Sequence, residues 1–509
     1  MIDSLGRSGD TVAMDDDAPA AGITDADWAA TPPAVRAFFR ACLLTIRLQQ
    51  EQIAQLQQAN AALQQRVADL EARLGQHSQN SSKPPSSDPP SAPPRRPKTP
   101  RGRKAGGQSG HPRHDRPDPT PDQLDAVREH YPDACPTCQE PLTDRHRDAC
   151  AVQTQYVWEL PLLRPHITAH HYHTVCCSGC GALVTAERPA DVPPGAFGPR
   201  LAATVTVLHG DYHLSDRNVA RLLADCFGMP LSLGSVVTLQ QVGSAALAPV
   251  YMAIHTAVQQ QERCNIDETG WKEAGKRRWL WTMVTAVATF FAVMSSRDGP
   301  GLRHLLGSAY QGIVGSDRHR PYLALAPAHH QLCWSHLNRN FQALVDRGGR
   351  VGVWGADFLA LSRLVFRLWH LFREGTIDRP TLQDAMAPLQ AAMHALLVAG
   401  SRRGDAPEGM CQELLNHEEA LWTFVREEGV EPTNNAAEQA LRRAVLWRKG
   451  CFGAQSAEGN HFVERILSVS ATCRQQQRHL LTFVTEAITA YWAGRPAPAL
   501  LPAALSTPS

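Results

Sequence analysis

Two short apolar runs, each ending in an aspartate, constrain the fold of this chain more than any other feature. Residues 264–271 predict a short strand that ends at Asp267, and residues 312–317 predict a second strand that ends at Asp317. Around these runs the pattern predicts a strand pair at 278–287 and 289–296, a helix at 301–310, a strand at 329–334 and a helix from residue 335. Strand ends hold their side chains rigidly, so we expect the two carboxylates to converge.

A third acid, Glu438, lies on a predicted helix that follows Pro432, with Asn435 as its N-cap. Glu438 and Arg442 are four residues apart and share a face of this helix. Taken alone, Asn435 and Glu438 resemble a capping box, in which the glutamate only satisfies backbone donors. The two upstream aspartates favour another interpretation, because three converging carboxylates can hold two hard divalent cations.

Several motifs in one order resemble the insertion-sequence-66 family of DDE transposases. They are the runs Asp267-Glu268-Thr269, Asp317 with Tyr322, residues 333–341 (Cys-Trp-Ser-His-Leu-Asn-Arg-Asn-Phe), residues 432–438 (Pro-Thr-Asn-Asn-Ala-Ala-Glu), and the linker and cysteine regions described below. The family usually carries Arg after the glutamate, whereas this chain has Gln439. The substitution keeps the acid and removes one cation.

The resemblance implies a ribonuclease-H-like α/β catalytic core, which the predicted order of strands and helices also fits. It implies metal-dependent DNA cleavage and strand transfer at the ends of a bacterial insertion sequence. Asp267, Asp317 and Glu438 would hold two Mg²⁺ (or Mn²⁺) ions, one activating water or a 3′-hydroxyl and the other stabilising the leaving oxygen. The partners it implies are the element ends, target DNA and small companion proteins of the same element.

Basic residues near these acids are candidates for binding DNA phosphates. His336 and Arg339 follow the fifth predicted strand, although a buried histidine that caps a helix explains His336 equally well. The helix of Glu438 and its exit supply four more candidates: Arg442, Arg443, Arg448 and Lys449. Two other functions remain open, a non-catalytic DNA-binding regulator and a structure-specific nuclease on the same fold.

The length of 509 residues and a hydrophobic content of 43% predict a multidomain α+β protein. The net charge is only +1, but an acidic start at 1–30 and a basic stretch at 95–116 are separated. Thirteen cysteines and the lack of a secretory signal favour a reduced, cytosolic setting. The resemblance implies that this is the bacterial cytoplasm, with the protein associated with the nucleoid. We expect no membrane span, since the uncharged run 279–294 is shorter than about 20 residues.

Composition and periodicity divide the chain into successive segments. We expect a disordered acidic tail (1–33), a coiled-coil dimerisation helix (34–76), a flexible Pro-rich basic linker (77–122), a zinc-binding module (123–190), a helical, helix-turn-helix-like DNA-binding segment (191–260), the catalytic domain (261–455) with a helical insertion at about 345–430, C-terminal helices (456–493) and a disordered tail (494–509).

The zinc module rests on two C-x-x-C pairs, Cys135 with Cys138 and Cys177 with Cys180. Four thiolates form the closed tetrahedral set of a structural zinc site, and we expect one Zn²⁺ there. Strand-like runs at 152–161 and 165–174 suit a zinc ribbon. The alternatives are two redox-inert turns, or a ligand set that includes Cys176 or one of the histidines His170, His171 and His173.

Residues 200–237 predict a helix at 200–208, a capped helix at 214–223 and the start of a third, with a turn at 228–230. This arrangement is helix-turn-helix-like and could place the last helix on DNA. Few cations lie on that helix, so a plain helical bundle leading into the catalytic core explains the pattern as well.

A heptad repeat in residues 46–74 predicts a parallel two-stranded coiled coil, and hence a homodimer. Its a positions are Ile46, Ile53, Asn60, Val67 and Leu74, and its d positions are Gln49, Leu56, Leu63 and Leu70. A polar Asn at one a position fixes register and oligomeric state. The alternative is one amphipathic helix packed on the chain's own core.

We therefore predict that a peptide of residues 43–74 is a parallel dimer in sedimentation equilibrium. The Asn60→Leu peptide should be more stable and less selective for the dimer, because the substitution removes a buried polar group from the seam. A wild-type peptide that stays monomeric at roughly tens of micromolar would contradict the coiled coil.

Overall fold

The structure is a computed structural model that describes residues 22–81, 118–142, 153–402 and 407–501. Two compact units are present, residues 1–92 and residues 93–509, and each is considered by itself. Residues 1–21, 82–117 and 502–509, which make up most of the segments predicted to be disordered or flexible, lie outside the described residues. The segment 143–152 of the expected zinc module also lies outside them. Within the predicted tails, residues 25–30 instead form a helix, and Leu500 and Leu501 are buried in the hydrophobic core.

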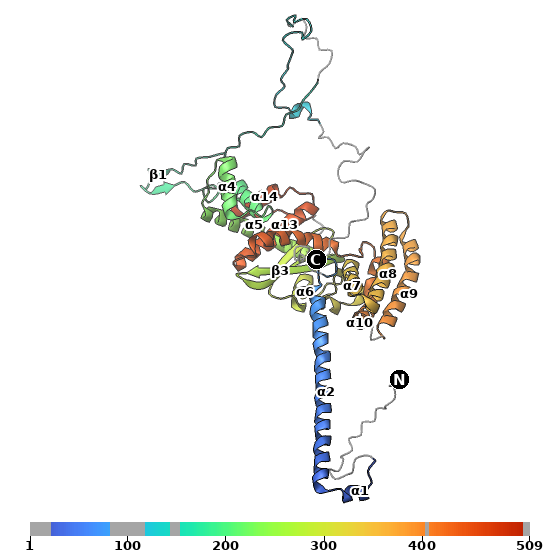
Figure 1. Cartoon of the computed structure of the whole chain (residues 1–509). Coiled ribbons are helices and arrows are strands. Elements are labelled where there is room, and N and C mark those ends of the chain that lie inside the picture. The colour runs from blue at the N-terminus through green and yellow to red at the C-terminus, as the bar shows by residue number, and fades with distance from the viewer. Residues whose placement is uncertain (1–21, 82–117, 143–152, 403–406, 502–509) are drawn as a thin grey trace. The chain divides into compact units, whose positions relative to one another are not determined.

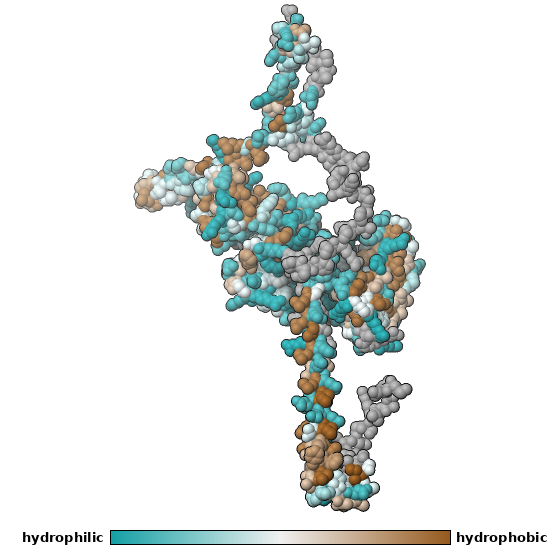
Figure 2. Space-filling view, in the orientation of Figure 1, coloured by the Kyte–Doolittle hydropathy of each residue, from teal (hydrophilic) through white to brown (hydrophobic). Residues whose placement is uncertain are grey.

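The first unit consists of a short helix and a long one, α1 (Asp25–Ala30) and α2 (Pro33–Leu74) (Figure 1). The apolar heptad residues of α2 are exposed; Leu56 and Leu63, for example, are each 62% exposed. Figure 2 shows this apolar surface along the length of the helix. Exposed apolar residues at heptad spacing suit the predicted dimer, which stays a prediction.

A five-stranded mixed sheet lies at the centre of the second unit, with strand order β5-β4-β3-β6-β7. The strands β3, β4 and β5 are antiparallel neighbours, while β6 and β7 run parallel to β3. Their bounds are β3 (Arg263–Glu273), β4 (Lys276–Val284), β5 (Thr289–Met294), β6 (Ile313–Ser316) and β7 (His330–Leu332), with α6 (Gly299–Leu306) between β5 and β6. The predicted order of elements in this region is therefore confirmed.

One boundary prediction was wrong. Asp267 does not end its strand but lies in the middle of β3, which continues to Glu273 because residues 265–273 all pair with β4. The alternation of polar and apolar residues after Asp267 is weak, so the sequence did not reveal this extension.

One hydrophobic core joins the sheet to the helices on either side of it in the sequence. These helices are α3 (Pro199–Gly210), α4 (Asp216–Phe227), α5 (Leu233–Gln259), α12 (Asn435–Cys451), α13 (Ala457–Gln475) and α14 (Leu480–Trp492). Ser215 and Ser232 cap α4 and α5 through side-chain bonds, and Gly228 ends α4 in the left-handed conformation that glycine favours. The helices predicted in this segment are confirmed, whereas a DNA-reading role for α5 stays untested.

Within the described residues, α5 alone is long and apolar enough to cross a membrane, with 27 residues and a mean hydropathy of 1.2. The sequence-based search for membrane spans overlooked it. The helix packs against α3, α13, α14 and β5, and its buried face includes Leu247 and Ile254. A core helix of this kind meets the same criteria of length and composition, so they are weak evidence for a membrane span.

Helix α13 protects the outer edge of the sheet. Its residues Glu464, Ser468 and Thr472, spaced four apart, accept bonds from the N–H groups of Val293, Phe291 and Thr289 in the edge strand β5, at 2.6, 2.9 and 3.2 Å. Four residues advance a helix by about 6 Å and two residues advance a strand by about 6.6 Å, so the two repeats match. The side chains thus replace the missing neighbouring strand.

The expected helical insertion has a hydrophobic core of its own. It contains α7 (Trp334–Arg347), α8 (Gly349–Arg373), α9 (Arg379–Gly400), α10 (Glu408–Asn416) and α11 (Thr423–Arg426). In Figure 1, α8 and α9 lie side by side as an antiparallel pair. This lobe connects β7 to α12, and so carries the chain from the second aspartate to Glu438.

The cysteine region has a different secondary structure from the one predicted. Residues 153–173 contain no strand, because no other segment pairs with them. A hairpin of β1 (Thr174–Cys176) and β2 (Leu183–Thr185) instead encloses the second C-x-x-C pair. Apolar residues here are exposed, including Leu160 (84%) and Ile167 (85%).

The edge contacts of α13 lead to a stability prediction. Ser468→Ala should lower the free energy of unfolding by about 1–3 kcal/mol, because the buried N–H of Phe291 loses its acceptor. Thr256→Ala, which removes an exposed hydroxyl bonded only within its own helix, is the control and should change stability by less than about 0.5 kcal/mol. Equal effects in urea unfolding would contradict a special role for the edge.

A second prediction concerns pH. Burial, with a smaller contribution from His417, lowers the pKa of His330 to about 3. Between pH of about 6 and 3 the unfolded chain takes up this proton and the folded chain does not, so stability falls as pH falls, by up to about 1.4 kcal/mol per pH unit. In urea unfolding, His330→Gln should flatten this dependence, whereas His329→Gln, at the exposed neighbouring histidine, should leave it unchanged. If the free energy of unfolding depends on pH with the same slope in both variants, His330 is not the source of the pH dependence.

Candidate active site

The ends of β6 and β7 lie beside the middle of β3. Asn265 of β3 pairs with Gly315 of β6, the last pair between these strands, so Asp267 and Asp317 each lie two residues beyond it. Ser316 lies opposite Leu332 of β7, so the next residue, Cys333, comes level with Asp317; the Cys333 N–H donates to the Ser316 carbonyl at 2.9 Å. Residues opposite one another in a sheet project to the same face. Asp317 and Cys333, the residues that directly follow β6 and β7, therefore lie near Asp267 of β3.

Asp267 lies in strongly negative surroundings. Its pKa is raised well above the usual value, first by burial and then by the charges of Glu268, Asp317 and Glu438. The N–H of Glu268 donates to its Oδ1 at 2.9 Å and partly offsets the shift. The three predicted acids are therefore close enough for their charges to interact, although 171 positions separate Asp267 from Glu438.

Asp317 begins a tight turn after β6. Its Oδ1 accepts a bond from the N–H of His319 at 2.8 Å. Next to it, the hydroxyl of Ser316 lies 2.8 Å from Nε2 of the buried His330, which joins the ends of β6 and β7. These bonds fix the backbone on both sides of the carboxylate.

Glu268, next to Asp267, is committed to structural partners. Its buried carboxylate accepts bonds from the Tyr322 hydroxyl and from Arg297. Burial and the charge of Asp317 raise the pKa of Glu268, whereas Arg297 and Tyr322 lower it. Through its bond to Glu268, Tyr322 connects the turn that follows Asp317 to strand β3.

Glu438 is carried by α12, which packs on β3 and β4. The N-cap of this helix is Asn434 rather than the predicted Asn435, and its side chain does not cap the helix. The Asn434 amide instead donates to the Ile266 carbonyl at 2.8 Å, and its backbone N–H donates to Sγ of Cys333 at 3.2 Å. Asn434 thus anchors the start of α12 beside Asp267, a long-range role that a local capping pattern does not reveal.

The carboxylate of Glu438 contacts residues of α7. It lies 3.3 Å from the Arg339 guanidinium and 3.5 Å from Nε2 of His336. A capping box from Asn435 is not formed, since the first residue of α12 cannot also be its cap. The structure therefore brings together Glu438, His336 and Arg339.

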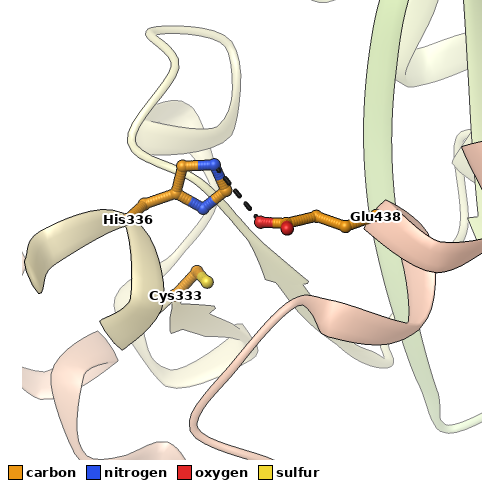
Figure 3. Close-up of side chains that lie close together, drawn as sticks. All are labelled: Cys333, His336 and Glu438. Atoms are coloured by element: carbon orange, nitrogen blue, oxygen red, sulfur yellow. Dashed lines mark ion pairs between the residues drawn. The ribbon is translucent and has the colours of Figure 1, made fainter. Parts of the chain in front are cut away.

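His336, Cys333 and Glu438 form a tight group (Figure 3). One ligand atom from each lies within 4.8 Å of the others, and among the described residues this is the one such group of three or more potential metal ligands. Burial lowers the pKa of His336, and the charges of Asp317 and Glu438 partly offset that effect. Cys333 was named in the sequence motif but not recognised as a site residue.

The four cations of α12 divide into two kinds. Arg443 bonds to Asp211 at 3.3 Å, and Arg448 donates to Thr269 Oγ1 at 3.0 Å and to the Gly270 carbonyl. These two guanidiniums hold α12 to α3 and β3. Arg442 and Lys449 are exposed.

The two C-x-x-C loops share one backbone conformation. In each, the N–H four residues after the first cysteine donates to that cysteine's carbonyl at 2.8 Å, from Gln139 to Cys135 and from Gly181 to Cys177. Backbone N–H groups also lower the pKa of Cys135 and Cys177. The four thiols do not form a group within 4.8 Å, so the zinc site stays a prediction.

Two relatives with curated sequences are uncharacterized proteins of Sinorhizobium fredii. Protein y4hP is 26% identical over 337 residues, which cover 58% of this chain and 60% of the relative. Protein y4qI is 25% identical over 272 residues, which cover 47% of this chain and 50% of the relative. The chain thus spans only about half to three fifths of the length of these relatives.

Two family models match the chain. The first covers residues 30–117 and is described as a family of unknown function (DUF6444). The second, described as the Transposase IS66 family, covers residues 194–461 and so contains every residue of the site around Asp267, Asp317 and Glu438. It spans more than half of the sequence and confirms the resemblance seen there. The chain belongs to the IS66 transposase family.

Proposed function

We propose that this chain catalyses metal-dependent DNA cleavage and strand transfer at the ends of an insertion sequence, with Asp267, Asp317 and Glu438 as its catalytic acids. The observation that carries the proposal is the bond from the Asn434 amide to the Ile266 carbonyl, which holds the start of the Glu438 helix beside Asp267. The charges of Asp317 and Glu438, which raise the pKa of Asp267, support it. Carboxylates brought together from distant segments against their own repulsion are a common sign of a functional site.

The topology supports a ribonuclease-H-like core. Three antiparallel strands are followed by a helix and two strands parallel to the first, in the order β5-β4-β3-β6-β7. In such a sheet the acids of β3 and β6 lie side by side, and a helix packed over β3 can add the third. The helical insertion would then be an addition between β7 and α12.

The donor set suits Mg²⁺ or Mn²⁺, because it is made of carboxylate oxygens that are short of positive charge. Two such ions would activate the attacking water or 3′-hydroxyl and stabilise the leaving oxygen. Asp267 would act as a ligand in its charged form, which bound cations would stabilise. Arg339 balances the charge of Glu438.

In this proposal, exposed cationic side chains bind the DNA. Arg442 and Lys449 remain candidates for phosphate binding, whereas Arg443 and Arg448 hold α12 in place. His336 is buried against Glu438 and suits a role at the site better than one on the DNA surface. We further propose a homodimer through α2, help from companion proteins of the element, and action in the bacterial cytoplasm at the nucleoid.

The cysteine region is proposed to bind one structural Zn²⁺ through Cys135, Cys138, Cys177 and Cys180. The matching conformations of the two loops and their thiol-directed N–H groups support this proposal. The exposed apolar residues between them are consistent with a module that gains its packing on metal binding.

A non-catalytic regulator would bind DNA but would not need the acids, and a nuclease would cut DNA without joining it. The distinguishing measurement is metal-dependent joining of a 3′-hydroxyl end to target DNA. We predict that Asp267→Ala, Asp317→Ala and Glu438→Ala each reduce joining by at least about a thousandfold, equivalent to about 4 kcal/mol in the barrier, and leave DNA binding largely intact.

Glu408→Ala is the matched control, because Glu408 is also a glutamate in the first turn of a helix but is exposed and outside the site. It should join DNA at the wild-type rate. Arg442→Ala should instead weaken DNA binding and reduce the slope of its salt dependence by about one. Wild-type joining by the Asp267 variant would disprove the mechanism, and cutting without joining by the wild-type chain would favour the nuclease.

A further inference from the structure

The site contains a thiol and an imidazole that the proposed reaction does not use. Cys333 and His336 belong to the start of α7, and both face Glu438 across the gap to α12 (Figure 3). Sulfur, nitrogen and oxygen donors within 4.8 Å of one another have the spacing of ligands around a single ion. The donors come from two elements whose positions are fixed by the sheet and by Asn434.

Backbone groups around Cys333 stabilise its thiolate form, which a bound cation would stabilise further. Its Sγ accepts the backbone N–H of Asn434 at 3.2 Å, and the N–H groups of Ser335 and His336 at the start of α7 also stabilise its charged form. Burial nevertheless dominates and raises the pKa of Cys333 to about 11. The site is thus arranged for a negative sulfur but lacks the positive charge that would stabilise it.

His336 supplies an unused donor atom. The residue is only 8% exposed, and its Nδ1 is buried without a hydrogen-bond partner. Figure 3 shows this nitrogen turned toward Cys333, while the other ring nitrogen makes the contact with Glu438. A buried polar atom without a partner is costly, and a metal ligand is one role that explains it.

We propose that Cys333, His336 and Glu438 form a binding site for a thiophilic divalent cation of the Zn²⁺ class. Thiolate and imidazole ligands select such ions and are poor ligands for Mg²⁺. The site is therefore chemically distinct from the all-oxygen set at Asp267 and Asp317, although Cys333 is level with Asp317 in the sheet.

Glu438 belongs to both donor sets. If the proposed function holds, a thiophilic ion therefore affects catalysis. A Zn²⁺ ion held by Cys333 and His336 competes with the catalytic cations for the carboxylate of Glu438. Binding of a thiophilic ion therefore inhibits strand transfer by removing one acid from the reaction.

The test uses the full-length protein and Co²⁺, which occupies zinc sites and absorbs visibly when a thiolate is a ligand. The expected result is that wild type binds one more tightly held Co²⁺ per chain than Cys333→Ser or His336→Gln, with loss of the corresponding thiolate-to-cobalt band. Serine can still accept the N–H groups at the start of α7, and the glutamine variant leaves Cys333 untouched, so two independent variants guard against misfolding. Circular dichroism verifies that both variants are folded.

Cys411→Ser is the matched control, since Cys411 is buried and its pKa is also raised to about 11, but it has no partners for a metal site among the described residues. It should bind as much Co²⁺ as wild type. The cysteines of the two C-x-x-C loops are present in every variant and cancel in the difference. Equal Co²⁺ binding by wild type and the Cys333 variant overturns the proposal, as does an equal loss in the Cys411 variant.

Two further measurements separate this proposal from the catalytic one. Asp267→Asn should retain the additional Co²⁺; its loss would place the ion in the carboxylate site and overturn the proposal. Cys333→Ser should also raise the Zn²⁺ concentration that halves strand transfer by at least about tenfold. If the chain does not join DNA at all, the proposed function fails, but the difference in Co²⁺ binding still decides the metal site.

Discussion

The close parallel pairing of β3 with β6 is the constraint on which the site depends. At Gly315 a Cβ atom would come within 2.5 Å of Asn265 Oδ1, because the Asn265 side chain lies over the glycine. Glycine leaves room for that side chain, and the pair Asn265–Gly315 lies two residues before Asp267 and Asp317. Cys333 directly follows β7, as Asp317 directly follows β6. A slip of one residue would turn an aspartate to the other face of the sheet.

The charge distribution follows from that register. Glu268 pairs with Arg297 and accepts a bond from Tyr322, and Glu438 lies against Arg339. Asp267 has no comparable cation among the described residues, and burial among other acids raises its pKa. Glu268 and Glu438 thus have cationic partners within the protein, whereas Asp267 does not. Divalent cations would supply positive charge there, which is why the geometry and the proposed chemistry agree.

Apart from α7, the helices of the second unit that surround the sheet and α12 support them without taking part in the site. Helix α13 satisfies the edge strand, while α5 and α14 pack in the same core. The helical insertion is stabilised by a separate core. Changes within that lobe can therefore alter its surface while β3, β6 and α12 keep their positions. Cys333 and His336 lie where the lobe meets the sheet, and they connect its first helix to Glu438.

The sequence by itself determined most of the elements and the family, and it singled out the three acids that we propose as catalytic. Apolar periodicity predicted the strands and helices, Ser215 and Gly228 marked helix ends, and the spacing of motifs identified the family. These features are local, so a single stretch of chain contains the information.

Only the tertiary structure decided which side chains meet. It placed Asp267 within a longer strand, made Asn434 the anchor of α12, and turned Arg448 inward to β3. It also brought Cys333 and His336 to Glu438, across more than a hundred positions of sequence. Each of these outcomes depends on how distant segments pack, because hydrogen bonds and charges between them form only once the sheet and its helices share a core.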